Sequence, residues 1–406
     1  MVKLKSSTFH QTLIPSLEME QDYFSTVLRA FVNQDSALLC SCITNDLKKH
    51  YGGRALVFKL VRFKTDAIHI FPPNAQPFEE LVYCHLRALK YLLAANEKMV
   101  WASQKKILEI CVSFLQEENS EWMTPCILQW CRESRKLAYS LSKASGLIKE
   151  SKEVSECTMI LRNVCTAFNN KKNVMGGGLN GFVGSVNELS KILFAQSNIR
   201  LCQDIYESYR DRIAAELQQA PASQACTFYY YCGRLRLYED DYHGARDALT
   251  RALSLCDPNA PHNLQMVLFF LIPVNMLFGR LPSQAYQKLA QAVRTGDLPL
   301  YDRVLTDYAT VLVTRCLYLT VVSLKVLVQR SFLKRVITAY GSAQIPFQAI
   351  HKGFDLLRLH ESDDELCCML SVLKYKGYLK GYVSFTQKTL VVSKTQPFPP
   401  ISSVMK

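Results

Sequence analysis

Apolar residues recur every three or four positions along most of the chain, which is the spacing of one face of an α-helix. The clearest stretches before residue 220 are Phe78 to Leu93, Trp101 to Leu115, Thr124 to Leu141 and Glu188 to Leu217. Glycine and proline number only 16 and 15 in 406 residues and cluster between these stretches, where they end helices. The pattern therefore predicts a run of antiparallel helix pairs, as in an α-solenoid.

The best-marked helix pair is Phe228 to Tyr238 followed by Tyr242 to Cys256. Alanines on the apolar stripe of the second segment allow a neighbouring helix to approach closely. Tyr230-x-x-Gly233-Arg234 before Asp241-Tyr242-x-x-Ala245 resembles a tetratricopeptide unit, although no strict period of about 34 residues runs through the chain. We interpret this pair as architecture, and the acidic run 239–241 between its helices as a solvated turn.

The C-terminal part of the chain changes pattern. Ser362-Asp-Asp-Glu365 has the spacing of a capping box, and apolar residues at helical spacing follow it up to Leu373. Gly377 is placed to end that helix in a left-handed conformation. The segment from Leu379 to Val383 then alternates apolar and polar residues, and Thr389 to Ser393 forms a second strand.

Helix, glycine turn, strand, short turn and strand are the outline of a winged helix, with an ordinary α+β end-cap as the alternative. Three prolines between residues 397 and 400 are expected to end all regular structure. The predicted fold is mainly α, a helical-repeat array that ends in a C-terminal winged helix. The expected divisions are residues 1–215 (helical repeats), 216–340 (a second helical part), 341–395 (winged helix) and 396–406 (proline-containing tail).

Composition narrows the class of protein. A hydrophobic content of 49% excludes general disorder, and no segment holds the run of about 20 apolar residues that a membrane span needs. The N-terminus lacks the apolar core of a signal peptide, so we expect a soluble intracellular protein. The 15 cysteines include no Cys-x-x-Cys pair and fall mostly on apolar helical positions, which indicates buried reduced thiols and no metal site.

One feature could be mistaken for a cofactor site. Gly176-Gly-Gly178-Leu-Asn-Gly181 has the letters of a dinucleotide fingerprint, but a polar run precedes it where the fingerprint requires a strand. An inter-helix loop is the favoured interpretation, and an enzyme using the glycine-rich loop is the weaker alternative. No Ser or Cys with His and an acid shows a recognisable catalytic signature. We therefore expect no enzyme, no catalytic residue and no cofactor.

Positive charge is concentrated near the C-terminus. The net charge is +13, and residues 325–406 contribute more than half of it with twelve Lys or Arg against five Asp or Glu. A concentrated basic surface attracts phosphate backbones, although solvated surface charge or an acidic protein partner would produce the same pattern. The candidate nucleic-acid-binding residues are Lys325, Arg330, Lys334, Arg335, Lys352, Lys374, Lys376, Lys380, Lys388 and Lys394.

The string from Ala292 to Leu305, Ala-Val-Arg-Thr-Gly-Asp-Leu-Pro-Leu-Tyr-Asp-Arg-Val-Leu, resembles the core signature of the PCI-domain family. In that family, shared by the proteasome lid, the signalosome and a translation initiation factor, helical repeats lead into a winged helix. Other strings resemble the PCI subunits of the transcription-coupled mRNA export complex at the nuclear pore: Tyr231-x-Gly233-Arg234, Pro273-x-x-Met276-Leu-x-Gly279, Lys380-Gly-Tyr-Val and Leu390-Val-Val-Ser-Lys-x-x-Pro397-Phe-Pro-Pro.

The resemblance implies a non-enzymatic adaptor in the nucleus, on the nuclear-envelope side of the pore complex, with the cytoplasm as an additional location. The implied partners are a Sac/GANP-type scaffold subunit, a small acidic Sem/DSS-type protein, and RNA or DNA held through phosphates by paired winged helices. Tyr378 and Tyr382 are candidates for stacking on unpaired bases or, equally, for packing against the hairpin. The alternative is an assembly subunit of the proteasome lid or signalosome, in which the winged helix serves only protein contacts.

Overall fold

The computed structural model describes residues 18–60, 71, 76–117, 120–145, 151–170, 181–284 and 286–404. The chain divides into two compact units, residues 1–228 and 229–406, each described here by itself. The four narrower divisions expected from the sequence remain predictions.

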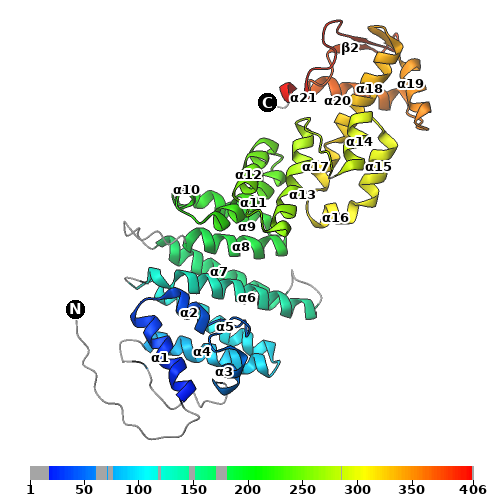
Figure 1. Cartoon of the computed structure of the whole chain (residues 1–406). Coiled ribbons are helices and arrows are strands. Elements are labelled where there is room, and N and C mark those ends of the chain that lie inside the picture. The colour runs from blue at the N-terminus through cyan, green and yellow to red at the C-terminus, as the bar shows by residue number, and fades with distance from the viewer. Residues whose placement is uncertain are drawn as a thin grey trace. The chain divides into compact units, whose positions relative to one another are not determined.

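The first unit is a stack of helices (Figure 1). Its elements are α1 (Glu18–Val32), α2 (Ser36–Cys42), α3 (Gly53–Leu60), α4 (Gln76–Leu93), α5 (Glu97–Phe114), the short 3-10 helix Glu121–Met123, α6 (Thr124–Ser145), α7 (Lys152–Asn170), α8 (Gly181–Gln196), α9 (Ile199–Ser208), α10 (Arg210–Leu217) and the beginning of α11 (Ala222–Tyr238). From α4 to α8 each helix packs on the next, and α5 and α6 also contact α7 and α8 respectively. This layering is the α-solenoid arrangement that the helical spacing predicted.

Large apolar side chains fill the spaces between these layers. Trp130 on α6, Phe78 on α4 and Phe182 on α8 are almost completely buried. Burying a side chain of this kind stabilises the fold by about 1.5–3 kcal/mol. The stack therefore depends on the apolar stripes that the sequence displays.

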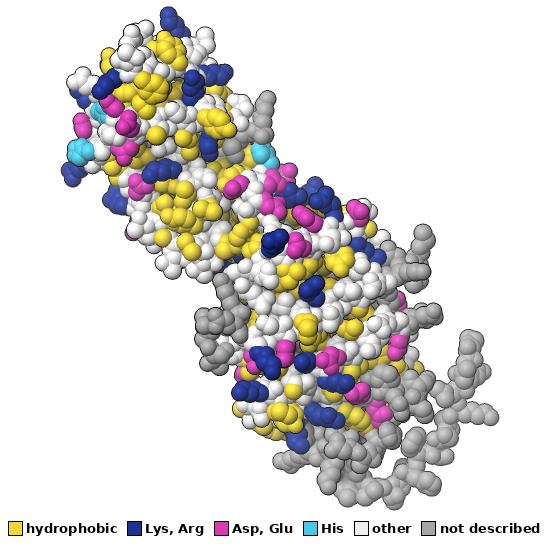
Figure 2. All heavy atoms as spheres, turned by 180° about the vertical axis from the view of Figure 1, so that it is seen from behind, with side chains coloured by type: hydrophobic (Ala, Val, Ile, Leu, Met, Phe, Trp, Pro, Cys, Tyr) yellow, Lys and Arg dark blue, Asp and Glu magenta, His cyan; other side chains and the backbone are white. Residues whose placement is uncertain are grey.

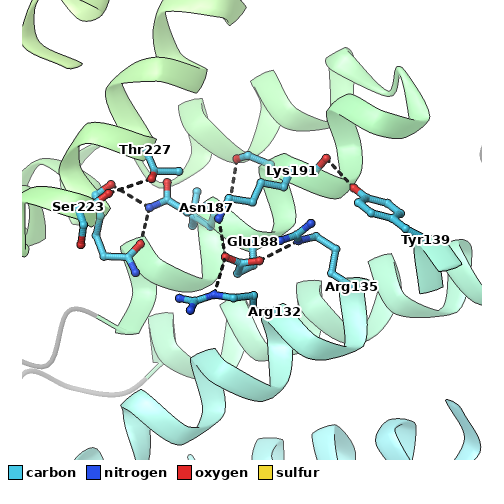
Figure 3. A network of polar contacts seen from close by, with 11 residues as sticks. Arg132, Arg135, Tyr139, Asn187, Glu188, Lys191, Ser223 and Thr227 are labelled. Carbon is cyan, nitrogen blue, oxygen red and sulfur yellow. Dashed lines mark hydrogen bonds and ion pairs between the residues drawn. The ribbon is translucent and has the colours of Figure 1, made fainter. Parts of the chain in front are cut away.

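A buried polar network fixes α8 between α6 and α11 (Figure 3). The Glu188 carboxylate accepts hydrogen bonds from Arg135 Nε at 2.8 Å and Lys191 Nζ at 2.6 Å. Burial opposes ionisation of this carboxyl, but Lys191 and Arg135 outweigh burial and lower its pKa. The neighbouring Asn187 donates through Nδ2 to the carbonyl and side-chain oxygens of Gln224 on α11, at 3.0 and 2.8 Å. These partners fix the register of three helices.

The helices of the second unit begin with the pair that the sequence marked. After the end of α11 come α12 (Tyr242–Leu255), α13 (Pro261–Leu277), α14 (Gln287–Thr295), α15 (Leu298–Asp307), α16 (Ala309–Thr314), α17 (Tyr318–Val322) and α18 (Lys325–Tyr340). Asp241 caps α12 by accepting a hydrogen bond from the Gly244 N–H at 2.8 Å. Gly233 on α11 lies against Leu249 of α12, where a larger side chain would collide. This confirms the helix pair and gives the acidic turn a capping role.

Gly296 explains the glycine in the Ala292–Leu305 string. It ends α14 with a φ of 71°, in the left-handed region, and a Cβ at this position would overlap the backbone of Phe332 on α18. Asp297 next to it begins α15 by accepting a hydrogen bond from the Leu300 N–H at 2.9 Å. The string is therefore a tight turn that brings α14 and α15 against α18.

A three-stranded winged helix follows α18. Its elements are β1 (Gln344–Pro346), α19 (Phe347–Leu356), α20 (Asp363–Tyr375), β2 (Gly381–Ser384) and β3 (Thr389–Val392), with antiparallel strand order β1-β3-β2. The capping box of Ser362 and Glu365 is present, and Gly377 has a φ of 79°. The helix, the glycine turn and both strands of the predicted hairpin are confirmed, with the first strand beginning at Gly381, two residues later than expected.

The spacing of apolar residues from Glu188 to Leu217 suggested one helix, but the structure divides this segment among α8, α9 and α10. Ser197 has a φ of 58° after the end of α8, and the Asn198 side chain begins α9 by accepting a hydrogen bond from the Leu201 N–H. Asparagine competes with the helix by bonding to the nearby backbone, so an uninterrupted apolar stripe does not guarantee an uninterrupted helix.

The proline-containing tail is more ordered than predicted. A short helix, α21 (Ile401–Val404), follows the prolines, and both the N–H and the hydroxyl of Ser403 donate to the Pro400 carbonyl. The fixed φ of proline is compatible with a helix N-terminus, so the prolines begin a turn instead of ending all structure. Within the described residues, none of the helices combines the length and apolar character that crossing a bilayer requires.

Candidate nucleic-acid interface

The ten predicted phosphate-binding residues lie on α18, α19 and α20, in the connection from α20 to β2, in the β2–β3 turn and just after β3. Nine of the ten are exposed, and Arg330 is buried with 9% exposure. On the face displayed in Figure 2, Lys and Arg side chains lie scattered among apolar, neutral and acidic ones. The contacts of each candidate therefore decide whether a phosphate can reach it.

Arg330 is the clear correction to the predicted set. Its Nη2 donates to the Pro399 carbonyl at 2.8 Å, its guanidinium lies 5.6 Å from the centre of the Phe398 ring, and burial lowers its pKa. A guanidinium held under the tail is not available to a phosphate. Sequence reasoning placed it on a basic face because the tail that covers it comes 69 residues later in the chain.

Two further cations are already paired with carboxylates. Lys325 Nζ lies 3.3 Å from Asp302 Oδ1, and Lys388 Nζ lies 2.7 Å from Asp363 Oδ2. The hydrogen bond to Asp363 raises the pKa of Lys388. Asp363 also contacts His351 Nε2 at 2.8 Å, so the tip of the wing, at Lys388, is attached to the acidic first turn of α20. An approaching phosphate would have to compete with that turn.

Four lysines gather at the opposite end of α20. Lys374 and Lys376 lie at the C-terminal end of this helix, and the Ser393 N–H donates to the Lys380 carbonyl at 2.9 Å, so Lys380 lies beside the segment that carries Lys394. A helix of 13 residues is roughly 20 Å long, which separates these four from Lys388. We call Lys374, Lys376, Lys380 and Lys394 the lysine group.

Three more cations, Lys334, Arg335 and Lys352, are exposed on α18 and α19. These helices pack together, with Gly353 against Phe332 and Val336. Among the described residues, none of these three cations and none of the lysine group has a carboxylate within ion-pair distance. Of the ten predicted residues, seven on α18 and the winged helix therefore carry positive charge that no described carboxylate pairs with.

The two candidate tyrosines have different environments. Tyr378 is buried with 5% exposure, which favours its packing role, whereas Tyr382 is 56% exposed. Strand pairing explains why Tyr382 is exposed. Val383, opposite Leu390, faces the core, so Tyr382, opposite Val391, faces solvent. Lys380 lies directly before β2, two residues ahead of Tyr382. A cation and an exposed aromatic ring this near in the chain can hold a phosphate and an unpaired base together.

Sequence reasoning missed two exposed aromatic residues near this surface. Tyr375 at the end of α20 is 92% exposed, and Phe385 after β2 is 62% exposed. The signal for Tyr375 was available, because it falls outside the stripe formed by Leu366, Leu370 and Leu373. Phe385 gave no such signal, because its exposure results from the turn that follows β2.

Of the glycine-rich string, only Gly181 lies within the described residues. The described element before it is the helix α7, which ends at Asn170, whereas a dinucleotide site follows a strand. Gly181 begins α8, so the last glycine of the string belongs to a helix and not to the expected loop. The described residues also contain no group of three or more His, Cys, Asp or Glu side chains placed to hold a metal ion.

The chain is similar to several characterised proteins, although no family model matches it. It is 29% identical to a PCI domain-containing protein 2 homolog of Drosophila melanogaster, over 80% of this chain and 86% of the relative. It is 28% identical to PCI domain-containing protein 2 of Xenopus laevis, over 81% and 86%. A Protein CSN12 homolog of Mycosarcoma maydis is 27% identical over 70% of this chain and 71% of its own length.

These relatives confirm the resemblance to the PCI-domain family that the Ala292–Leu305 string indicated. Over about four-fifths of its length, the chain specifically resembles PCI domain-containing protein 2. Together with the fold, they support a subunit of a PCI-type complex.

Proposed function

We propose that this chain, which resembles PCI domain-containing protein 2 over four-fifths of its length, is a non-enzymatic adaptor subunit of a nuclear-pore-associated, transcription-coupled mRNA export complex. Its winged helix binds RNA or DNA together with a partner subunit. It acts in the nucleus, on the nuclear-envelope side of the pore complex, with the cytoplasm as an additional location.

The observation that carries the nucleic-acid proposal is the lysine group with Tyr382. Four exposed lysines, unpaired with any carboxylate among the described residues, lie on the segments at one end of the winged helix, and the exposed Tyr382 comes two residues after Lys380. Phosphate contacts of this kind release counterions and carry no sequence information. Binding should therefore weaken steeply with salt and discriminate poorly between sequences.

The proposed protein partners are a Sac/GANP-type scaffold subunit and a small acidic Sem/DSS-type protein. Exposed apolar side chains of the second unit support protein docking, among them Tyr308 at 51% and Val311 at 50% exposure. Large apolar residues at such exposure are typical of interaction surfaces when they lie close together. Phe269, Tyr286, Leu289, Tyr308 and Val311 line one groove of this unit.

The test is affinity purification of the tagged full chain at low salt, with identification of the co-purifying chains and of retained RNA. In the variant Lys376→Glu/Lys380→Glu/Lys394→Glu we expect RNA retention to fall at least tenfold while the protein subunits still co-purify. A matched control, Lys48→Glu/Lys90→Glu/Lys143→Glu, changes the net charge equally on exposed lysines of the first unit. Retention that is unchanged by the first variant, or lost equally in both, refutes the assignment.

The second candidate is an assembly subunit of the proteasome lid or signalosome. The exposed Leu356, Tyr375 and Phe385 on the winged helix favour it, because these side chains suit a protein contact as well as a base. In that case, Leu356→Asp would release partner subunits, whereas the lysine variant would change nothing.

A further inference from the structure

Two cysteine thiols from distant parts of the chain meet in the first unit. Cys40 on α2 and Cys126 in the first turn of α6 lie with their sulfur atoms 3.1 Å apart, although 86 residues separate them in sequence. Cys40 is half-buried, and Cys126 is fully buried behind it. Cys316, by contrast, is exposed and hydrogen-bonds to Tyr238.

The surrounding contacts fix the two sulfurs in this position. Gln129 Nε2 donates to the Cys40 carbonyl at 3.1 Å, and Trp130 Nε1 donates to the Ile43 carbonyl at 3.2 Å. One turn further along α6, Glu133 accepts a hydrogen bond from Thr44 Oγ1 at 2.8 Å. Three residues within two turns of α6 thus hold the end of α2 and the two residues after it, so the meeting of the thiols rests on helix packing.

The two thiols differ in chemical character. The hydrogen bond from Cys126 lowers the pKa of Cys40, although burial and Glu133 oppose this. The same hydrogen bond, followed by burial, raises the pKa of Cys126. Burial alone raises the pKa of Cys111, a neighbouring cysteine without a thiol partner. The nucleophile is the thiolate, so the pair consists of one reactive cysteine and one resolving cysteine beside it.

We propose that Cys40 and Cys126 form an oxidation site that hydrogen peroxide converts to a disulfide between α2 and α6. The Cys40 thiolate attacks one peroxide oxygen; the O–O bond breaks, Cys40 becomes a sulfenic acid, and the departing hydroxide takes a proton to form water. The Cys126 sulfur then attacks the Cys40 sulfur, the S–O bond breaks, and the hydroxide leaves as water with the Cys126 proton. In sum, two thiols lose two electrons and two protons, and peroxide is reduced to two waters.

The disulfide would link α2 to α6 and close a long loop. Closing a loop of this length restricts the unfolded chain more than the folded one, so the first unit should resist heat better when oxidised. We expect its unfolding midpoint to rise by several degrees. The proposal concerns the first unit only and is independent of nucleic-acid binding.

The test treats the folded full chain with hydrogen peroxide, blocks free thiols, and maps cysteines by mass spectrometry after digestion. We expect a peptide pair linked through Cys40 and Cys126 to appear at lower peroxide than modification of Cys316. In Cys126→Ser, dimedone should trap a sulfenic acid on Cys40, whereas Cys40→Ser should leave Cys126 unlabelled. Cys316→Ser should leave the cross-link unchanged.

Oxidation of Cys316 and Cys368 without any Cys40–Cys126 linkage in the wild-type chain would overturn the proposal. So would a linkage that forms equally in urea, because the folded geometry would then play no part. The wild-type measurement does not depend on the folding of any variant, so an unstable substitution cannot conceal the answer.

Discussion

Replacing Gly296 by alanine is the sharpest test of how the second unit is held together. A residue with a side chain at a φ of 71° costs about 1–2 kcal/mol, because its Cβ crowds the following carbonyl. The added Cβ would also overlap the backbone of Phe332 on α18, and such overpacking costs roughly 1–3 kcal/mol more. We therefore expect Gly296→Ala to lower the free energy of unfolding of this unit by about 2–5 kcal/mol.

Gly341 provides a matched control in the same unit. It ends α18 with a φ of 75°, but a Cβ there would meet no atom within 4 Å. Gly341→Ala should therefore show the conformational cost alone, about 1–2 kcal/mol. The difference between the two variants isolates the contact between the α14–α15 turn and α18.

The assay must report on the second unit. All three tryptophans lie in the first unit, so hydrogen exchange of α14, α15 and α18, measured by mass spectrometry, is the suitable readout. Faster exchange is expected in these helices for Gly296→Ala than for Gly341→Ala. Equal exchange in the two variants would refute the close approach of the Gly296 turn to α18.

Three further predictions concern other parts of the molecule. Burial lowers the pKa of His50, and burial together with the nearby charge of His50 lowers the pKa of His85. Below about pH 6.5 these two histidines bind fewer protons in the folded first unit than in the unfolded chain, so its free energy of unfolding should be highest above that pH and fall toward pH 5. A flat pH profile of unfolding, detected by tryptophan fluorescence, would contradict this. Tyr382→Ala should weaken binding of a single-stranded oligonucleotide by about 1–3 kcal/mol and leave duplex binding unchanged, whereas Tyr382→Phe should bind both as the wild type does. Fluorescence-anisotropy titrations measure both affinities, and equal losses for the single strand and the duplex would exclude stacking. Arg330→Ala should release residues 398–404 to proteolysis without reducing RNA retention; a loss of retention with an intact tail would return Arg330 to the phosphate-binding set.

Local patterns predicted the elements of the winged helix well. The capping box at Ser362, the turn at Gly377 and the alternation around Val383 each depend on neighbouring residues, and the structure contains all three. The Ala292–Leu305 string was recognised from sequence, but its physical reason, the approach of Gly296 to α18, required the fold. Strong local signals therefore carried the element types and the family resemblance.

Long-range contacts account for what the sequence could not predict. Arg330 looked like one more surface cation until the tail was seen to cover it, and Lys388 looked free until Asp363 was found beside it. The meeting of Cys40 and Cys126 likewise depends on how α2 docks on α6, which neither local sequence contains. Counting basic residues in the sequence thus identified the candidate nucleic-acid-binding surface, but it did not show which of the cations are free to contact a phosphate.

The salt dependence of nucleic-acid binding tests the central claim most directly. The full chain with its co-purified subunits is titrated against single-stranded RNA at several salt concentrations, and the logarithm of the binding constant is plotted against that of the salt. Each lost phosphate contact reduces the slope by about 0.7, so Lys376→Glu/Lys380→Glu/Lys394→Glu should flatten it by about 2 relative to the wild type and to the first-unit control. An unchanged slope, with the subunits still assembled, would contradict the account.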